Sequence, residues 1–281
     1  MLKEPLQIDV EKIVRSHTTR RVPRCLINWL ARLIHQDEIN TFLRTEGRVE
    51  GYPFFQAVLD LVHCTDSIEG LDNLRALPSE QRLIFVSNHP LGALEAMALG
   101  KELGAVYGDK INFVVNDLLM YLRPLQQFFT PVNVVTARQD KQVGACIEQL
   151  FASDKQVVMF PAGACSRRQH GVITDLPWKK MFITKARQYG RSVVPIYCHG
   201  RNSERFYRVA ALRKRLGFKL NLEMLLLPDE MFRQRGRNIH ITIGKVINAN
   251  RFDSSRSDIF WANCVRQVVY QLKTNSSRTG F

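Results

Sequence analysis

From residue 80 onward, short apolar runs alternate with longer stretches of helix-like composition, and this alternation limits the folds open to the chain. The apolar runs are rich in the β-branched and aromatic residues of buried strands. They are Leu83–Val86, Ile111–Val115, Val132–Val135, Val157–Phe160, Val193–Tyr197 and Ile239–Ile243. The helix-like stretches are Ala93–Leu103, Leu118–Arg123, Lys141–Ala152, Trp178–Tyr189, Arg205–Leu216 and Ile259–Leu272. The sequence therefore predicts an α/β fold, with a mostly parallel central sheet flanked by helices.

The chain before this region predicts a helical N-terminal segment over residues 1–75, followed by an α/β domain over residues 76–281. Six apolar residues recur at helical spacing, namely Val22, Leu26, Trp29, Leu30, Leu33 and Ile34. Four arginines lie near them, namely Arg20, Arg21, Arg24 and Arg32. A basic amphipathic helix of this kind can lie on an anionic membrane surface. Packing of the apolar face on the domain core is the alternative, and the sequence leaves both open.

The charge of the chain points to an acidic partner. Over 281 residues the formal net charge is +14, and 45% of the residues are hydrophobic, as in a globular protein. Such an excess of positive charge attracts nucleic acid, anionic lipid head groups or an acidic carrier protein. The sequence has no zinc-finger spacing, helix-turn-helix or aromatic ribonucleoprotein pattern. We therefore expect lipid or carrier protein, and not nucleic acid, as the partner.

The cysteines and the hydropathy of the chain indicate where it works. Six cysteines occur, and none of them forms a Cys-x-x-Cys pair. The first residues lack the apolar core of a signal peptide, so a reducing cytoplasm and free thiols are expected. No apolar run approaches the roughly 20 residues that span a bilayer. The expected location is therefore cytoplasmic, with peripheral contact at the inner face of the cell membrane.

The first segment with residues suited to catalysis contains a histidine followed by an acid. His89 follows the strand-like run Leu83–Val86 after two residues, and Glu95 lies in the helix-like stretch beyond it. An imidazole can take a proton from a hydroxyl group, and a carboxylate can orient the ring and stabilise its charged form. A separation of six does not bring two side chains together on one helix, so they meet only across a non-helical Pro-Leu-Gly turn. We predict His89 as a general base and Glu95 as its partner, with Glu102 as the alternative acid.

A second segment repeats this layout and adds positive charge. The strand-like run Val157–Phe160 is followed by small residues that include Gly163, and then by Ser166 and Arg167. Backbone N–H groups in a small-residue turn, with a guanidinium beside them, suit a phosphate or carboxylate. Gly163, Ser166 and Arg167 are therefore predicted to bind an anionic group. No local pattern places a base beside Cys165, so no nucleophilic role is predicted for this thiol.

Together these segments resemble the lysophospholipid (glycerolphosphate) acyltransferases. That family has Asn-His followed by four residues and Asp, and later Phe-Pro-Glu-Gly-Thr-Arg-Ser. This chain has Asn88 and His89 in the first block, and Phe-Pro-Ala-Gly over residues 160–163 in the third. Arg138 is similar to the arginine of the second block, and Val193–Ile196 is similar to the fourth. The blocks keep the family's order over roughly residues 80–200.

Two positions depart from the family pattern. Leu94 stands where the family has its aspartate, and the acid is Glu95, one residue later. Ala162 stands where the third block has its glutamate. The fuller pattern is similar to a bacterial, haemolysin-like branch, some of whose members resemble acyltransferases of amino-acid lipids. The resemblance therefore speaks more directly to the reaction than to the acceptor.

The resemblance implies an O-acyltransferase that moves a fatty acyl chain from an acyl carrier protein or coenzyme A thioester to the hydroxyl of a single-chain anionic lipid. The acceptor would be an amino-acid lipid or a lysophospholipid. His89 and Glu95 would be catalytic, and the substrate-binding residues would be Asn88, Arg138, Gly163, Ser166 and Arg167. No metal or bound cofactor is implied, since the thioester is a cosubstrate. The alternative is a non-catalytic, peripheral lipid-binding protein on the same fold.

Overall fold

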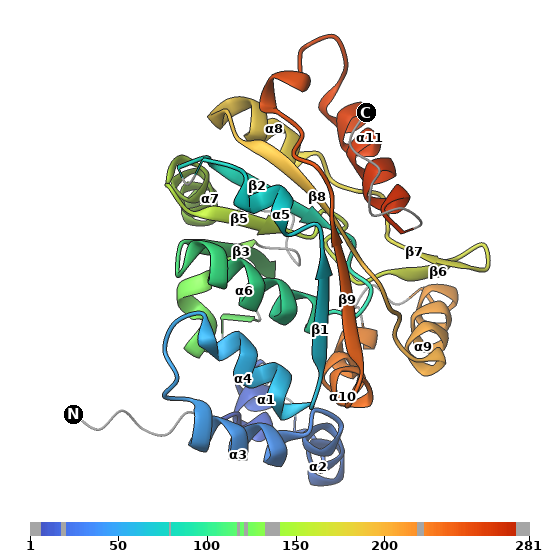
Figure 1. Cartoon of the computed structure of the whole chain (residues 1–281). Helices are drawn as coiled ribbons and strands as arrows, with labels where there is room; N and C mark the ends of the chain where they lie inside the picture. The colour runs from blue at the N-terminus through green and yellow to red at the C-terminus, as the bar shows by residue number, and fades with distance from the viewer. Residues whose placement is uncertain are drawn as a thin grey trace.

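A seven-stranded sheet forms the centre of the molecule (Figure 1). The computed structural model describes residues 7–17, 21–78, 80–116, 119–120, 123–132, 141–217 and 222–273. In spatial order the strands are β1 (Thr65–Glu69), β9 (Asn238–Ile243), β8 (Ser192–Cys198), β2 (Leu83–Ser87), β5 (Gln156–Met159), β3 (Ile111–Asn116) and β4 (Phe129–Val132). A separate antiparallel hairpin consists of β6 (Arg167–Gln169) and β7 (Val172–Thr174).

The sheet is mostly parallel, as the sequence predicted. β8, β2, β5, β3 and β4 are parallel neighbours, whereas β9 pairs antiparallel with β8 and parallel with β1. The carboxyl ends of the neighbouring strands β8, β2 and β5 therefore lie side by side in the middle of the sheet. In open α/β sheets, ligands bind at the carboxyl ends of the strands.

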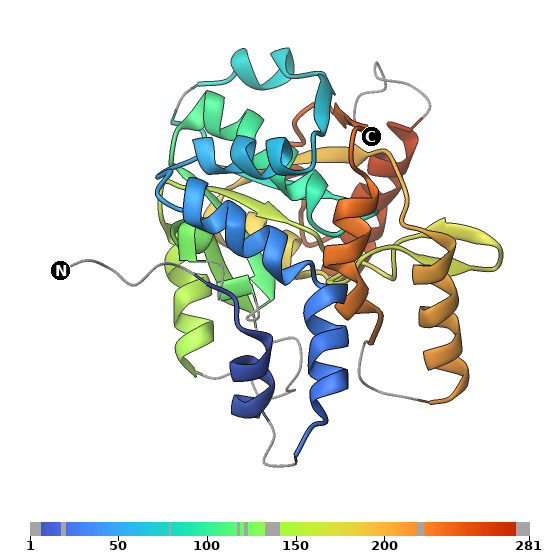
Figure 2. The same cartoon turned by 90° about the horizontal axis from the view of Figure 1, so that it is seen from below.

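Helices cover both faces of the sheet (Figures 1 and 2). The α-helices before the central strand are α1 (Val10–His17), α2 (Arg24–Leu33), α3 (Gln36–Glu46), α4 (Pro53–Leu61) and α5 (Asp72–Arg75). Those after it are α6 (Leu94–Tyr107), α7 (Lys141–Ala152), α8 (Met181–Tyr189), α9 (Glu204–Arg215), α10 (Leu227–Arg233) and α11 (Asp258–Gln271). Short 3-10 turns are η2 (Arg123–Phe128), η3 (Leu222–Leu226) and η4 (Ala249–Arg251).

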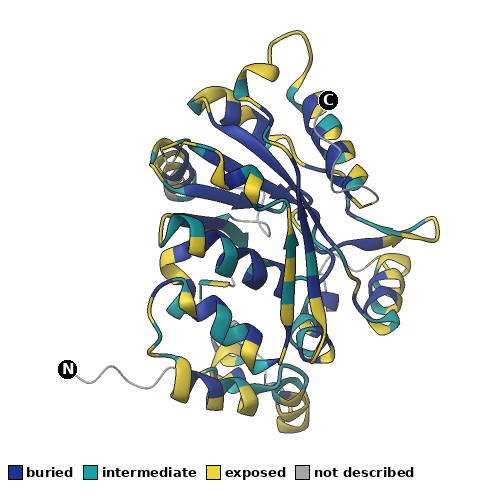
Figure 3. Cartoon of the chain, in the orientation of Figure 1, coloured by how far each residue is buried: buried dark blue, intermediate teal, exposed yellow. Residues whose placement is uncertain are grey.

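The two-residue period of the central strand divides the core between these faces. Leu83 and Phe85 belong to a cluster with apolar residues of α3, α4 and α6, whereas Ile84 and Val86 belong to a cluster with residues of α7, α8 and α11. All four side chains are fully buried, and Figure 3 shows the strands of the centre as the most buried part of the chain. A strand covered on both faces has a continuous apolar run, which is why this element could be predicted.

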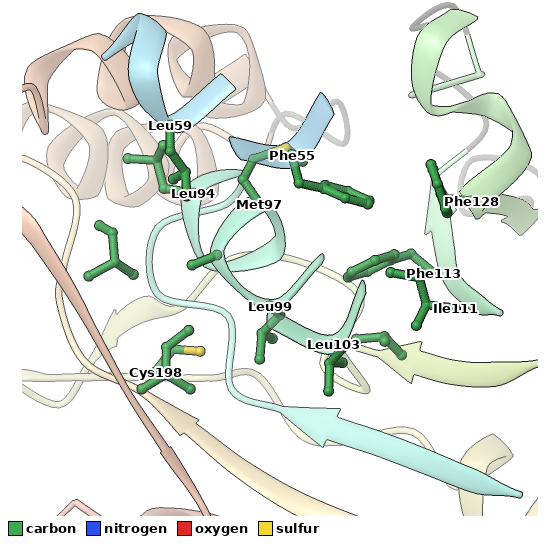
Figure 4. Packing of buried hydrophobic residues seen from close by; sticks show 14 of the residues in the cluster. Phe55, Leu59, Leu94, Met97, Leu99, Leu103, Ile111, Phe113, Phe128 and Cys198 are labelled. Carbon is green, nitrogen blue, oxygen red and sulfur yellow. The ribbon is translucent and has the colours of Figure 1, made fainter. Parts of the chain in front are cut away.

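Close packing fixes α6, the helix that follows β2, against α4 (Figure 4). A Cβ atom added at Gly100 of α6 would lie 2.5 Å from the Phe55 ring, and one added at Gly104 would lie 2.5 Å from Tyr52. Glycine is therefore required at both positions, because any side chain would force the helices apart. The N-terminal helices and the helix that carries Glu95 thus share one core.

Several elements differ from the prediction. Residues 1–75 are not helical throughout, because Thr65–Glu69 forms edge strand β1, whose polar, half-exposed composition hides it. Strand β4 covers Phe129–Val132 and shares only Val132 with the run expected at Val132–Val135, whose other residues lie outside the described ones. Of the helix expected over 118–123, residues 118, 121 and 122 are likewise outside, and a 3-10 turn begins at Arg123.

Candidate active site

The carboxyl end of β2 leads into the turn that carries His89. Residues 88–93 are non-helical, and Gly92 has a φ of +99°, a left-handed conformation that favours glycine. Helix α6 begins at Leu94, so Glu95 lies in its first turn. The turn folds back on the helix, and His89 Nδ1 lies 2.9 Å from Glu95 Oε1. The geometry thus meets the condition that the six-residue spacing imposed.

The carboxylate of Glu95 is fully buried and tightly held. Its Oε1 accepts hydrogen bonds from the backbone N–H groups of Leu91 and Gly92 at 3.0 and 2.9 Å, in addition to its contact with His89. Burial raises the pKa of this carboxyl, but the charge and hydrogen bond of His89 outweigh burial and hold the pKa below its ordinary value. The alternative acid, Glu102, pairs instead with Lys101 at 3.0 Å. Glu95 is therefore the acid that orients the ring.

The imidazole of His89 has two further neighbours. It stacks on the ring of Phe160, with centroids 4.2 Å apart and planes at 26°. Burial lowers the pKa of His89, but the charges of Cys165 and Glu95 and hydrogen bonding with both raise it well above its ordinary value. The ring nitrogen that does not face Glu95 is the one left for proton transfer.

Asn88 holds the neighbouring strand in place. Its Oδ1 accepts from the backbone N–H of Cys198 at 2.7 Å, and its Nδ2 donates to the carbonyl of the same residue at 2.8 Å. The side chain is buried, so both ends of the amide serve the junction of β2 and β8. The substrate-binding role predicted for Asn88 stays a prediction, because in the structure its amide fixes the base of the His89 turn.

Asp175 joins the two segments that the sequence singled out. Its Oδ1 accepts from the Ser166 hydroxyl at 2.6 Å and from the backbone N–H of His89 at 3.2 Å, and its Oδ2 accepts from the Trp178 indole at 2.9 Å. Ser166 also donates its backbone N–H to the His89 carbonyl at 2.7 Å. Burial raises the pKa of Asp175 against the effect of these hydrogen bonds. Ser166 is therefore brought to His89, but its hydroxyl is used in fixing the turn.

Arg167 differs from its prediction in a specific way. Its Nη2 lies 2.9 Å from Glu223 Oε1, its Nη1 donates to the Cys165 carbonyl at 2.6 Å, and the guanidinium lies over the Phe206 ring at 4.9 Å. The side chain is 11% exposed and that of Glu223 is 0% exposed. A buried guanidinium needs such a partner, because an unpaired charge in the interior is costly. The structure thus places Arg167 in an internal ion pair and not in an open anion site.

Of the two remaining predicted residues, Gly163 lies at the surface and Arg138 lies outside the residues that the structure describes. Gly163 is exposed, with a φ of +69°, and a Cβ atom at this position would lie 3.2 Å from Lys179 Nζ. The Gly163 turn therefore carries an ammonium group that the sequence analysis did not single out. Arg138 lies outside the described residues. Within the described ranges, no cluster of three or more His, Cys, Asp or Glu could hold a metal ion.

Comparison with known proteins assigns the family. The sequence model of the acyltransferase family matches residues 10–280. A relative from Bacteroides thetaiotaomicron, named lyso-glycine lipid O-acyltransferase, is 44% identical over 268 residues, which cover 94% of this chain and 97% of the relative. A relative of the same name from Phocaeicola vulgatus is 42% identical over 268 residues, covering 94% and 95%. This chain belongs to the acyltransferase family.

Among solved structures, the 1-acyl-sn-glycerophosphate (LPA) acyltransferase PlsC from Thermotoga maritima matches 95% of this acyltransferase and 88% of its own chain, with a TM-score of 0.48 and 17% identity. No helix among the described residues of the acyltransferase is long and apolar enough to cross a membrane.

Sequence reasoning missed three residues of this acyltransferase site. Asp175 and Glu223 lie 86 and 56 residues from their partners His89 and Arg167, and no local spacing indicates such pairs. Cys165 follows β5 whereas its neighbour His89 lies in the turn after β2, so local sequence does not indicate their proximity. Only for Arg167 could an acidic partner have been expected, because a buried charge needs a counter-charge.

Proposed function

We propose that this acyltransferase transfers a fatty acyl chain from a carrier thioester to the hydroxyl group of a lyso-glycine lipid. The observation that carries the proposal is the His89–Glu95 pair at the carboxyl end of the central strand, 2.9 Å between Nδ1 and Oε1. Both curated relatives, at 44% and 42% identity, are named for acyl transfer to this lipid. A positioned histidine with an orienting carboxylate suits deprotonation of a hydroxyl.

In this reaction His89 moves the proton. The neutral imidazole takes the hydroxyl proton as the oxygen attacks the thioester carbonyl, so a C–O bond forms and the C–S bond breaks. The imidazolium then gives the proton to the departing thiolate, which leaves as a thiol. Because the pKa of His89 is raised, a neutral ring is scarce at low pH, and turnover should increase as the pH rises through this pKa.

The acceptor requires a cation for its carboxylate. Arg167 already pairs with Glu223, so it does not serve this purpose in the structure. The ammonium of Lys179 lies beside Gly163, three residues after the Phe160 whose ring stacks on His89, and it is the described cation that we assign to the carboxylate. Arg138 keeps its predicted substrate-binding role as part of the proposal.

The donor and the location follow from charge. Acyl carrier protein and coenzyme A are both acidic, and a net charge of +14 favours either. We place the protein at the inner face of the cell membrane, held peripherally by α2, whose Leu26 and Trp29 are 43% and 54% exposed beside exposed arginines. Exposed apolar residues with basic neighbours are typical of helices that lie on anionic lipid.

A competition assay tests the substrate. Purified protein receives one acyl thioester together with equal amounts of an N-(3-hydroxyacyl)glycine and lysophosphatidic acid, and mass spectrometry measures the two ester products. We expect the acylated glycine lipid to dominate, and Lys179→Ala to raise KM for the glycine lipid more than it lowers kcat. A preference for lysophosphatidic acid would reject the acceptor. The absence of any ester, with vesicle binding intact, would favour the non-catalytic lipid-binding alternative.

A further inference from the structure

Large apolar side chains are exposed at the end of α9 and on the turn η3, where neither the core nor the proposed chemistry uses them. Leu212 and Leu216 are 56% and 60% exposed, and Leu225 of η3 is 46% exposed. These fractions are comparable with those of Leu26 and Trp29 on α2, on which the proposed location depends. Apolar side chains that gather at a surface indicate a contact with another body, because their exposure to water costs free energy.

The exposed leucines of α9 share one face of the helix with basic residues. Leu212 and Leu216 follow Arg208 at intervals of four residues, a spacing that places side chains on one helix face. The backbone N–H of Leu216 donates to the carbonyl of Leu212 at 2.9 Å, so the helical turn continues through Leu216. Lys214 and Arg215, in the same turn, are exposed as well. Apolar residues with basic neighbours are typical of helices that bind anionic lipid.

The opposite side of α9 is buried next to the candidate site. Phe206 and Tyr207 form an apolar cluster with Cys165. The Sγ of Cys165 lies 3.0 Å from the position that a Cβ atom would take at Gly92, in the turn that carries His89. The helix therefore has two apolar sides, one packed against the site and the other facing outward.

Helices α9 and α2 are held together as one body. Leu33, at the end of α2, packs against the apolar cluster of α9. Asp229 of α10 pairs with His35, which follows α2, at 3.1 Å, and also pairs with Arg205 of α9. In Figure 2 the start of α2 (blue) and the end of α9 (light orange) reach the same lower edge of the molecule. A flat surface laid along this edge would touch both helices.

We propose, building on the acyl transfer and the peripheral location proposed above, that the exposed side of α9 with η3 is a second membrane-binding surface, which lies on the same anionic bilayer as α2. We call it the α9 surface, and its members are Arg208, Leu212, Lys214, Arg215, Leu216 and Leu225. Its leucines enter the boundary of the acyl chains, and its three basic side chains lie among the head-group phosphates.

A bilayer fits this arrangement better than an acidic protein does, because a bilayer is a continuous plane that contacts both helices at one edge. Two contacts hold the bound protein in one orientation. The helix α9 then has its outer side on the lipid and its inner side on the cluster beside the His89 turn.

Tryptophan fluorescence tests insertion at a single position. In a Trp29→Phe background the native tryptophans that remain are Trp178 and Trp261, which are buried. Leu216→Trp then places a fluorophore in the α9 surface, and vesicles of phosphatidylcholine and phosphatidylglycerol carry bromine atoms on their acyl chains. We expect these vesicles to quench the added tryptophan. Ile259→Trp, at a 45% exposed apolar position of α11, is the matched control and should not be quenched.

Removal of both leucines tests how much the surface contributes to binding. Leu212→Asn/Leu216→Asn should weaken binding to the same vesicles by about tenfold in a flotation assay, because each leucine favours an apolar environment. Ile259→Asn/Phe260→Asn, which removes two exposed apolar residues from α11, should leave binding unchanged. Turnover of the leucine variant should fall when the acceptor lies in vesicles and should keep its wild-type value when the acceptor is dispersed in detergent.

The outcomes separate this proposal from the earlier ones. Quenching at Leu216→Trp, together with weaker binding of the leucine variant, supports the α9 surface. Quenching of the native Trp29 without quenching at Leu216→Trp overturns it and leaves contact through α2 standing. Unchanged vesicle binding with a raised KM for an acyl carrier protein thioester also overturns it, and assigns this side of α9 to the acidic carrier. Absence of wild-type turnover in detergent would reject the proposed acyl transfer, while the quenching result would still decide the surface.

Discussion

The turn after β2 and the turn after β5 have similar sequence layouts, yet their polar groups are used in opposite ways. In the first, the carboxylate of Glu95 converges on His89 and leaves the ring available. In the second, Ser166 and Arg167 are consumed by the buried acids Asp175 and Glu223. The polar groups of the first turn converge on an imidazole, whereas those of the second turn bind the first turn and a buried carboxylate.

The difference teaches that charge counted in a sequence is not charge available at a site. Arg167 lies in a motif position where a free guanidinium was predicted, but its side chain enters the interior. Once buried, the guanidinium gains more from Glu223 than from a transient substrate, because each buried charge must be paired to offset its lost hydration. A pattern of basic residues therefore needs a burial estimate before it is interpreted as a binding site.

The largest loss of turnover is expected for His89→Ala, which changes the turn after β2. Loss of the general base should reduce turnover by about 10²–10⁴-fold while the circular dichroism spectrum is retained, since His89 lies in a turn and contributes little to the core. Turnover and spectra are measured together on the same preparation. Turnover close to that of the wild type would remove the functional distinction between the turns.

Arg167→Ala should lower the free energy of unfolding. Any change in the substrate KM should result only from this loss of stability. Breaking a buried pair leaves Glu223 partly uncompensated and should cost about 3 kcal/mol in the free energy of unfolding, measured by urea denaturation. Arg168→Ala is the control, because Arg168 pairs with Glu204 on the surface and its loss should leave the midpoint unchanged. A stable Arg167→Ala protein with a greatly raised KM would restore the anion-binding prediction.

Glu95→Gln should lower turnover by about 10²-fold, a moderate loss compared with those seen when the orienting carboxylate of a catalytic triad is removed. Glu95 also contributes to raising the pKa of His89, so the variant's pH profile should reach its midpoint at lower pH than that of the wild type. Glu102→Gln, which removes a partner of Lys101, should change neither. Equal effects of the two variants would show that the wrong acid has been assigned.

The smallest effect concerns exposed charge. Arg24→Ala, at the start of α2, should weaken binding to vesicles that contain anionic lipid by about fivefold at low salt, because each basic residue near such a surface adds about 1 kcal/mol. Arg167→Ala should leave vesicle binding unchanged, since its charge is internal. Binding that ignores anionic lipid and salt would contradict the peripheral location.

Much of the fold could be predicted because its central strands are buried on both faces. Leu83–Ser87 and Ser192–Cys198 are apolar almost throughout, and their prediction was accurate to within a residue at either end. Strand β1 was missed because it lies at the sheet edge and alternates exposed and half-buried residues, with Ile68 as its single large apolar side chain. The hairpin β6–β7 was missed because each strand has only three residues.

The contacts of the site likewise divide into those made within one turn and those made between distant segments of the chain. The contact of His89 with Glu95 depends on one short turn, so spacing and turn chemistry sufficed to predict it. The partners Asp175, Glu223 and Cys165 depend on how separate strands and helices are brought together, and one sequence does not contain that information in local form. The substrate-binding roles of Asn88 and Ser166 stay predictions, because in the structure their side chains bind the Cys198 backbone and Asp175.

Gly100 and Gly104 of α6 fix the distance between this helix and α4. Phe55 and Tyr52 sit where the first carbon of any side chain at positions 100 and 104 would have to go, so the spacing of α4 from α6 has no room to grow. The same helix carries Glu95 in its first turn. A methyl group added at Gly100 should therefore displace the Glu95 carboxylate, which lies about one and a half helical turns away, and substitutions at these two glycines should impair turnover as well as folding.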